Sequence, residues 1–328
     1  MAQTRYFSQH DANTNGEPPS SNAALTLAYR TFGNPANPVV FIPSCFSGKL
    51  DTTLTFLYLP SADNTPPVLQ DYFCIVCGLL GGRRVVVPVK FSRFSPRPTH
   101  ALCLSLGVTK LYAYIGFSMG GQQAYHMAVL FPQFADRVVV IAASARTSWH
   151  NYSFLEGPKA ALVNSVDFHD GNYQTPAVRG TRAFARVYAT WALSQAWFRA
   201  HSWETLGYKD LEEYLRVVWE GGRGGWDAHD LLAMIHTWQG GDISQFGPEE
   251  DKGDLAKALG RIQARVLLMP SRSDFYFPPE DSAEEVKYLK HGELRVIESI
   301  WGHIAGGGGG TKEDNEFIKA EIKRFLTS

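Results

Sequence analysis

The segment Gly116-Phe117-Ser118-Met119-Gly120-Gly121 has the residue types and spacing that can turn a serine into a nucleophile. A Gly-x-Ser-x-Gly pattern predicts a turn so tight that the positions beside the serine tolerate almost no side chain. The run Lys110–Ile115 before it is typical of a buried strand, and Gln122–Leu130 after it has the apolar spacing of a helix. We therefore expect Ser118 to stand in a strained turn, with its hydroxyl raised above a sheet at the start of a helix.

A serine hydroxyl is a poor nucleophile at neutral pH, so a base must take its proton and a carboxylate must orient that base. Suitable residues follow two predicted strands late in the chain. Asp274 comes soon after the run Arg265–Pro270, and His303 comes after the run Leu294–Glu298. The order serine, acid, histidine agrees with this assignment. The nearest rival acid, Asp281, falls where a helix is expected to begin.

An acyl transfer through a serine also needs two backbone N–H groups to stabilise the oxyanion. Met119, directly after the nucleophile, is one candidate donor. The second is expected in the loop after the run Val39–Pro43, where we choose Phe46. The resulting mechanism is ping-pong: His303 deprotonates Ser118, an acyl-enzyme forms, and water or another nucleophile takes the acyl group.

Strand-like runs alternate with helical patterns along most of the chain, and several are continuous Val/Ile/Leu runs. Such runs are typical of parallel strands that are covered on both faces. The sequence therefore predicts an α/β fold with a mostly parallel sheet, in a single domain over residues 1–328. The predicted strands are Leu25–Thr31, Val39–Pro43, Tyr72–Leu80, Lys110–Ile115, Arg137–Ala142, Arg265–Pro270 and Leu294–Glu298. The helix Glu313–Leu326 closes the chain.

One long interval, from Ala143 to about Ala264, shows no strand pattern. We expect a helical cap over residues 147–245, lying above the nucleophile. Its helices are predicted at Thr181–His201, Leu211–Glu220 and Ala228–Trp238. The interval is rich in aromatic residues, which either line a substrate tunnel or only pack the cap onto the sheet. The candidates for substrate binding are Tyr188, Trp191 and Trp238.

Composition excludes several classes of function. The 328 residues carry a formal net charge of −1, which gives no footprint for nucleic acid. No apolar stretch is long enough to span a membrane, and the polar segment 1–21, expected to be flexible, lacks a secretion signal. Cys74 and Cys77 lie in a predicted strand, so they are interpreted as core residues and not as a redox or zinc motif. We expect a cytoplasmic protein with no metal site.

Several segments together resemble the homoserine O-acetyltransferase (MetX-like) branch of the α/β-hydrolases, and in particular its fungal members. The resemblance implies an α/β-hydrolase fold with a helical cap, and the roles of nucleophile, acid and base for Ser118, Asp274 and His303. It also implies no cofactor, with acetyl-CoA as co-substrate if the chain is an acyltransferase, and a homodimer as one possible assembly. The matching segments are Tyr29-Arg30-Thr31-Phe32-Gly33, Gly116-Phe117-Ser118-Met119-Gly120-Gly121, Ala145-Arg146-Thr147-Ser148, Ser273-Asp274-Phe275-Tyr276-Phe277-Pro278-Pro279 and Trp301-Gly302-His303.

Two departures from this branch bear on activity. The homoserine enzymes carry an Asn-Glu-Val-Gln-Arg-type segment with an arginine suited to a substrate carboxylate, whereas this chain has His150–Lys159 there. We therefore favour hydrolysis of an ester or thioester of a hydrophobic small metabolite, with secondary metabolism as a context. A CoA-dependent O-acetyltransferase is the first alternative. The second is a catalytically impaired binding protein, because the connection Leu80–Gly107 is short and Arg83–Lys90 has an extended pattern.

Overall fold

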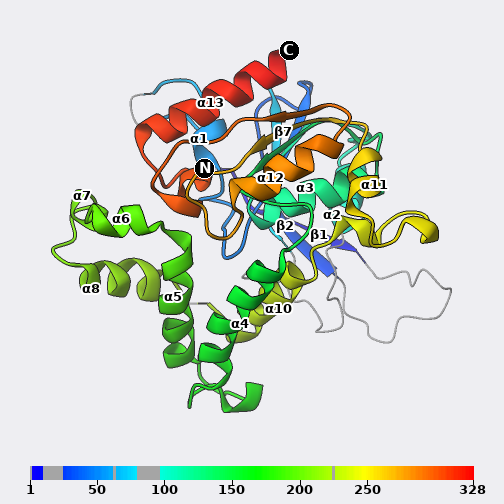
Figure 1. Cartoon of the computed structure of the whole chain (residues 1–328). Helices are drawn as coiled ribbons and strands as arrows, with labels where there is room; N and C mark the ends of the chain where they lie inside the picture. The colour runs from blue at the N-terminus through cyan, green and yellow to red at the C-terminus, as the bar shows by residue number, and fades with distance from the viewer. Residues whose placement is uncertain (1, 10–24, 62–63, 80–96, 224–225) are drawn as a thin grey trace.

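The computed structural model describes residues 2–9, 25–61, 64–79, 97–223 and 226–328, and an eight-stranded sheet lies at its centre (Figure 1). The strand order is β1-β2-β4-β3-β5-β6-β7-β8; β1 and β2 pair antiparallel to their neighbours, and all the other pairs are parallel. This confirms the predicted α/β class with a mostly parallel sheet. The strands are β1 (Arg5–Gln9), β2 (Leu25–Phe32), β3 (Val39–Pro43), β4 (Phe73–Cys77), β5 (Leu111–Phe117), β6 (Ala135–Ile141), β7 (Arg265–Met269) and β8 (Gly292–Leu294).

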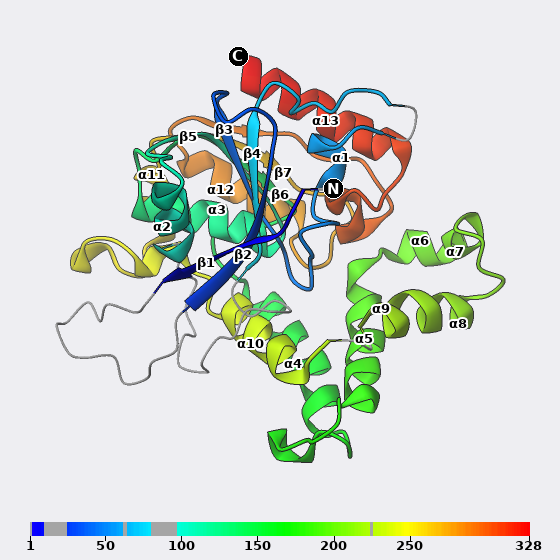
Figure 2. The same ribbon diagram turned by 180° about the vertical axis from the view of Figure 1, so that it is seen from behind.

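The central strands are covered on both faces, as their continuous apolar runs predict. In β3 the side chains of Val40 and Ile42 join the apolar cluster on one face, and Phe41 joins the cluster on the other. Helices α2 (Arg97–Ser105), α3 (Met119–Leu130), α11 (Leu255–Gly260) and α12 (Pro279–Glu285) cover one face, while α1 (Thr55–Tyr58) and α13 (Lys312–Thr327) cover the other (Figure 2).

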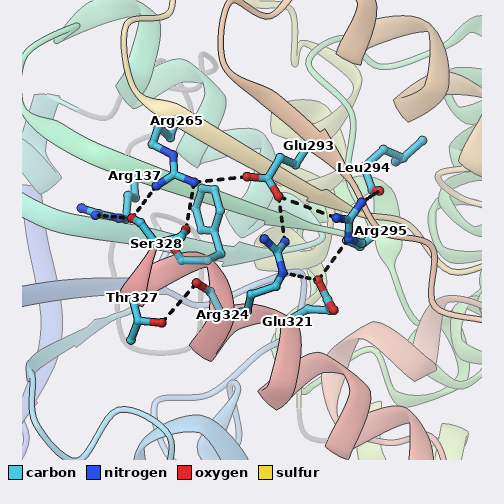
Figure 3. Close-up of polar contacts among 10 residues, drawn as sticks. Arg137, Arg265, Glu293, Leu294, Arg295, Glu321, Arg324, Thr327 and Ser328 are labelled. Atoms are coloured by element: carbon cyan, nitrogen blue, oxygen red, sulfur yellow. Dashed lines mark hydrogen bonds and ion pairs between the residues drawn. The ribbon is translucent and has the colours of Figure 1, made fainter.

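The C-terminal helix α13 is fastened to the sheet by packing and by charge. Its Ile318, Ile322 and Phe325 are fully buried against the strands. At its last turns lies a group of alternating charges, which we call the Arg–Glu cluster (Figure 3). Glu293 of β8 bonds Arg324 at 2.8 Å and Arg265 at 3.2 Å. The members are Arg265, Glu293, Arg295, Glu321 and Arg324.

Between β6 and β7 the described residues form helices and no strand, with one isolated bridge from Arg146 to Asp242. The predicted helix at 181–201 is divided, because Ser194 accepts a hydrogen bond from the N–H of Trp197 and so starts a new helix. The boundaries of a separate cap at 147 and 245 stay a prediction. The elements are α4 (Trp149–Val163), η1 (His169–Gly171), α5 (Val178–Ala192), α6 (Gln195–Arg199), α7 (Ser202–Thr205), α8 (Leu211–Tyr214), η2 (Leu215–Glu220), α9 (Gly221–Arg223), α10 (Ala228–Gln239), η3 (Ile243–Gln245), η4 (Glu249–Asp251) and α11.

The ends of the sheet depart from expectation at two places. The prediction that residues 1–21 are flexible is wrong for the part that forms β1. The edge of β2 offers backbone groups with which β1 pairs, and Phe7 packs against the core. Residues 10–24 lie outside the described part of the chain, as does the whole of the segment 83–90. The strand predicted at 294–298 is wrong in its bounds: β8 ends at Leu294, and Ile297 forms only a bridge with Ser271. As β8 is an edge strand, pairing constrains it on one side only.

In the described part of the chain, no helix combines the length and the apolar run that crossing a bilayer requires.

Candidate active site

Ser118 stands between β5 and α3 in a backbone conformation that residues other than glycine rarely adopt, with φ 57° and ψ −127°. Such strain persists only where the surroundings enforce it, and it is common at functional sites. Here the close packing of the turn holds Ser118 in this conformation. A Cβ on Gly116 would lie 2.1 Å from the carbonyl oxygen of Gly120, so only glycine fits. The expected tight strand–turn–helix is therefore present around Ser118.

The three side chains that the sequence predicts to be catalytic lie in one hydrogen-bonded row. The Nε2 atom of His303 is 2.9 Å from the Oγ of Ser118, and its Nδ1 is 2.7 Å from the Oδ2 of Asp274. Asp274 follows β7, and His303 lies in the 3₁₀ helix η6 (Gly302–Gly307) after β8. All three are nearly inaccessible to water, with exposures of 2–4%. Because parallel strands end at one edge of the sheet, residues up to 185 positions apart meet there.

Backbone groups hold the Asp274 carboxylate in place. Its Oδ1 accepts hydrogen bonds from the N–H of Tyr276 at 2.7 Å and from the N–H of Phe277 at 3.2 Å. The other oxygen, Oδ2, is thereby directed at His303. The rival acid Asp281 lies in α12, where the sequence predicts a helix, and its pKa is raised mainly by burial.

The loop 44–48 lies beside Ser118 at the same edge of the sheet. Ser44 anchors it to the end of β4: its N–H donates to the carbonyl of Cys77 at 2.7 Å, and its Oγ accepts from the N–H of Leu79 at 2.9 Å. Phe46 of this loop and Ser118 line the same cavity, while Met119 is the first residue of α3. The N-terminus of a helix carries partial positive charge, which favours an anion there. The role of both N–H groups as oxyanion donors stays a prediction.

A cavity of about 220 Å³ opens onto Ser118 and His303. Of the three aromatic residues predicted to bind substrate, Tyr188 lines it. Trp191 and Trp238 are not among the described lining residues, so the structure corrects these two predictions. Trp238 is fully buried behind two wall residues, with its ring 5.9 Å from the ring of Phe46 and 5.5 Å from the ring of Tyr276. The described lining is Cys45, Phe46, Ser47, Gly48, Thr52, Thr53, Leu54, Phe117, Ser118, Tyr188, Ala192, Trp219, Tyr276, His303, Ile304 and Gly307.

Trp191 is held away from the cavity by its own contacts. Its ring lies 5.0 Å from the rings of both His150 and Phe154. Two aromatic residues that line the cavity, Tyr276 and Trp219, were not among the three predicted to bind substrate. Tyr276 could have been found, because it stands two positions after the predicted acid.

The described wall of the cavity contains no Lys, Arg, Asp or Glu side chain. Nor do the described residues offer any cluster of metal-ligating side chains. Cys74 and Cys77 are buried in the sheet, and burial raises the pKa of the Cys74 thiol to about 12. They therefore lie in the core, as interpreted from the sequence.

A second buried carboxyl group, Glu285 of α12, lies beneath this edge of the sheet. It accepts hydrogen bonds from the Tyr125 hydroxyl at 2.7 Å and from the Ala145 N–H at 2.6 Å. Burial raises its pKa to about 8, although both hydrogen bonds act to lower it. Glu285 thus joins α12 to the helix that follows Ser118.

Comparison with known proteins agrees with the fold. The profile of the family described as "alpha/beta hydrolase fold" matches residues 92–307, more than half of the chain. The chain therefore belongs to the alpha/beta hydrolase fold family, and it is an enzyme of that family.

Relatives include both hydrolases and acyltransferases. A probable esterase of Corynebacterium glutamicum is 29% identical, covering 85% of this chain and 83% of the relative. An ethyl acetate hydrolase of Pseudomonas veronii is 33% identical over 60% of this chain and 56% of its own length. A homoserine O-succinyltransferase of Alkalilimnicola ehrlichii is 32% identical over 61% of this chain and 56% of its own length. The crystal structure of an acetylester hydrolase from Corynebacterium glutamicum has a TM-score of 0.87 and 27% identity, covering 100% of this chain and 96% of that one.

Proposed function

We propose that this chain hydrolyses small, uncharged carboxylic esters or thioesters, with Ser118 as nucleophile, His303 as base and Asp274 as the acid that orients it. The observation that carries the proposal is the row of hydrogen bonds from Asp274 through His303 to Ser118, at 2.7 and 2.9 Å. The similarity to esterases supports the reaction class.

Each residue has a defined task in this mechanism. The Nε2 of His303 takes the proton from Ser118 as the Oγ attacks the ester carbonyl. Asp274 holds the imidazole in orientation and stabilises its positive charge. The N–H groups of Phe46 and Met119 are proposed to stabilise the oxyanion. His303 then gives its proton to the departing alcohol or thiol. Water attacks the acyl-enzyme with His303 again acting as base, the bond between the acyl group and the Oγ of Ser118 breaks, and His303 returns the proton to Ser118 as the carboxylic acid leaves.

The chemistry of the cavity favours a small neutral substrate. Its described wall has no Lys, Arg, Asp or Glu side chain, so it offers no such group to pair with the carboxylate and ammonium groups of homoserine. A volume of about 220 Å³ is small beside typical drug-sized ligand pockets, and the aromatic walls favour apolar groups. Short esters of hydrophobic alcohols fit both conditions.

A second candidate is acyl transfer from a thioester such as acetyl-CoA to an alcohol, which the similarity to a homoserine O-succinyltransferase favours. Both reactions pass through an acyl-enzyme, so they differ only in the group that accepts the acyl chain. A catalytically impaired protein is the third alternative. The predicted fungal subgroup, homodimer and cytoplasmic location stay predictions.

The decisive experiment separates the three alternatives. The purified chain is incubated with p-nitrophenyl acetate, and separately with acetyl-CoA plus a panel of alcohols, while the acyl-enzyme is followed by mass spectrometry. We expect acetate release from the ester, an acetyl group on Ser118, and little transfer to alcohols. Dominant transfer would favour the acyltransferase. Failure of the folded chain to react with a fluorophosphonate probe would favour the impaired protein. Ser105→Ala, a serine of α2, is the matched control for Ser118→Ala.

A further inference from the structure

A π-turn in the helical insertion determines which side chain reaches the cavity at Ser118. The segment η2 is a π-helix, and the N–H of Gly221 donates to the carbonyl of Arg216, five residues earlier. In a regular α-helix, Val218 would share the inner face with Tyr214, four residues before it. Here Val218 is 37% exposed, and Trp219 is buried and lines the cavity. One extra residue in the turn thus exchanges a valine for a tryptophan at the wall.

The end of this π-turn is tied to the neighbouring helix α5 by an ion pair. Arg186 of α5 donates from its Nε to Glu220, the last residue of η2. The same guanidinium bonds Glu212 of α8, with 2.9 Å from its Nη1 to the Oε2. The Glu220 side chain is only 14% exposed, whereas that of Glu212 is 65% exposed. The contact to Glu220, next to Trp219, is therefore the one shielded from solvent.

Helix α5 is in turn connected to the proposed catalytic residues. Tyr188, two residues after Arg186, lines the cavity, and its carbonyl accepts a hydrogen bond from the Tyr276 hydroxyl at 2.6 Å. The N–H of Tyr276 donates to Asp274. A continuous set of contacts thus leads from Asp274 to Arg186.

We propose that Arg186 is a positioning residue. By binding Glu220, it holds the π-turn that places Trp219 in the wall of the Ser118 cavity. The enzyme is thereby restricted to substrates with short acyl or alcohol groups. The inference rests on the proposed ester hydrolysis. Without the ion pair, the turn can relax toward regular α-helix, which moves Trp219 outward and Val218 inward. The cavity then admits longer chains.

The test compares chain-length selectivity in five variants of the full-length protein. Two ester series are used, p-nitrophenyl acetate to hexanoate and ethyl to hexyl acetate, and the ratio of kcat/KM for the longest to the shortest member is measured in each. We expect Trp219→Val to raise this ratio about tenfold or more in at least one series, since each methylene accommodated is worth about tenfold. Arg186→Gln and Glu220→Gln should raise the ratio in the same series, and Arg186→Lys should restore much of the wild-type value. Glu212→Gln, which removes only the exposed contact, is the matched control and should leave it within about twofold.

The possible outcomes distinguish this inference from the function on which it rests. If no ester is turned over by the wild-type chain, the proposed function fails. If esters are hydrolysed but Trp219→Val leaves both ratios unchanged, Trp219 does not limit chain length and the inference is overturned. It is also overturned if folded Arg186→Gln and Glu220→Gln, checked by circular dichroism, keep the wild-type selectivity. Should Arg186→Gln not fold, Glu220→Gln alone decides.

Discussion

The two ends of the sheet hold their polar groups in opposite ways. At the carboxyl ends of the strands, Ser118, His303 and Asp274 are 2–4% exposed, and backbone N–H groups orient the carboxylate. At the amino ends lies the Arg–Glu cluster, whose side chains are 19–45% exposed and share partners (Figure 3). Glu293 alone contacts three arginines there.

This difference teaches how strongly each group depends on its partner. A buried polar group that loses its hydrogen-bond partner has no water to replace it, so the substitution costs the full desolvation free energy of that group. An exposed charge that loses one partner keeps water and its other neighbours, so exposed ion pairs contribute little. The effects of substitution should therefore be large at the carboxyl ends and small at the amino ends.

The largest effect is expected for Ser118→Ala. Because the substitution removes the nucleophile, kcat for ester hydrolysis should fall by about 10⁴-fold or more. Steady-state kinetics with p-nitrophenyl acetate measure it, alongside the melting temperature as a check on folding. Residual turnover within tenfold of the wild-type value would contradict the proposed role of Ser118.

Asp274→Asn should lower kcat by about 10³- to 10⁴-fold. The amide cannot stabilise the imidazolium of His303, although it keeps the shape of the carboxylate. Asp281→Asn is the matched control, since Asp281 lies in α12, seven residues further on. An equal loss in both variants would show that Asp274 has no special role.

Glu285→Gln should change the pH dependence of stability. The pKa of Glu285 is raised by burial to about 8, so the folded state keeps a proton that the unfolded state loses near pH 4.5. The protonated Glu285 therefore contributes its whole stabilising free energy of unfolding below about pH 4.5. This contribution declines as pH rises toward about 8, by an amount on the order of a few kcal/mol. Urea unfolding of the variant should lack this decline.

The exposed neighbour Glu284→Gln is the control for Glu285, because Lys287 and Tyr288 lower the pKa of Glu284 and no such decline is expected. Parallel curves of unfolding free energy against pH for the wild type and Glu285→Gln would refute the assignment.

The smallest effect is expected in the Arg–Glu cluster. Arg324→Gln removes bonds to Glu293 and Glu321 at 2.8 and 2.9 Å, yet it should cost about 1 kcal/mol or less, or about 3 °C in melting temperature. The difference in melting temperature between the variant and the wild type should be smaller at high salt. A larger loss, insensitive to salt, would show that the two ends of the sheet do not differ in the way described.

Much of the site could be predicted from short segments of sequence. The glycines beside Ser118 indicate a turn that only glycine permits, and Asp274 and His303 follow the strands that end beside it. The aromatic wall could not be predicted in the same way. Trp238 is a large aromatic residue, as expected of a binding residue, but it lies behind Phe46 and Tyr276, and Trp219 reaches the cavity only through a π-turn. Neither stacking behind a wall nor one extra residue in a helical turn has a sequence pattern.

The sequence by itself determined the strands β2 to β7, their mostly parallel arrangement, the turn at Ser118 and the positions of its two partners. These features depend on local apolar periodicity and on steric limits at glycine. Tertiary structure alone decided that β1 completes one edge of the sheet, that β8 ends at Leu294, and which rings surround the cavity. Those outcomes depend on contacts between segments far apart in the chain, and no local pattern specifies which partner a side chain will meet.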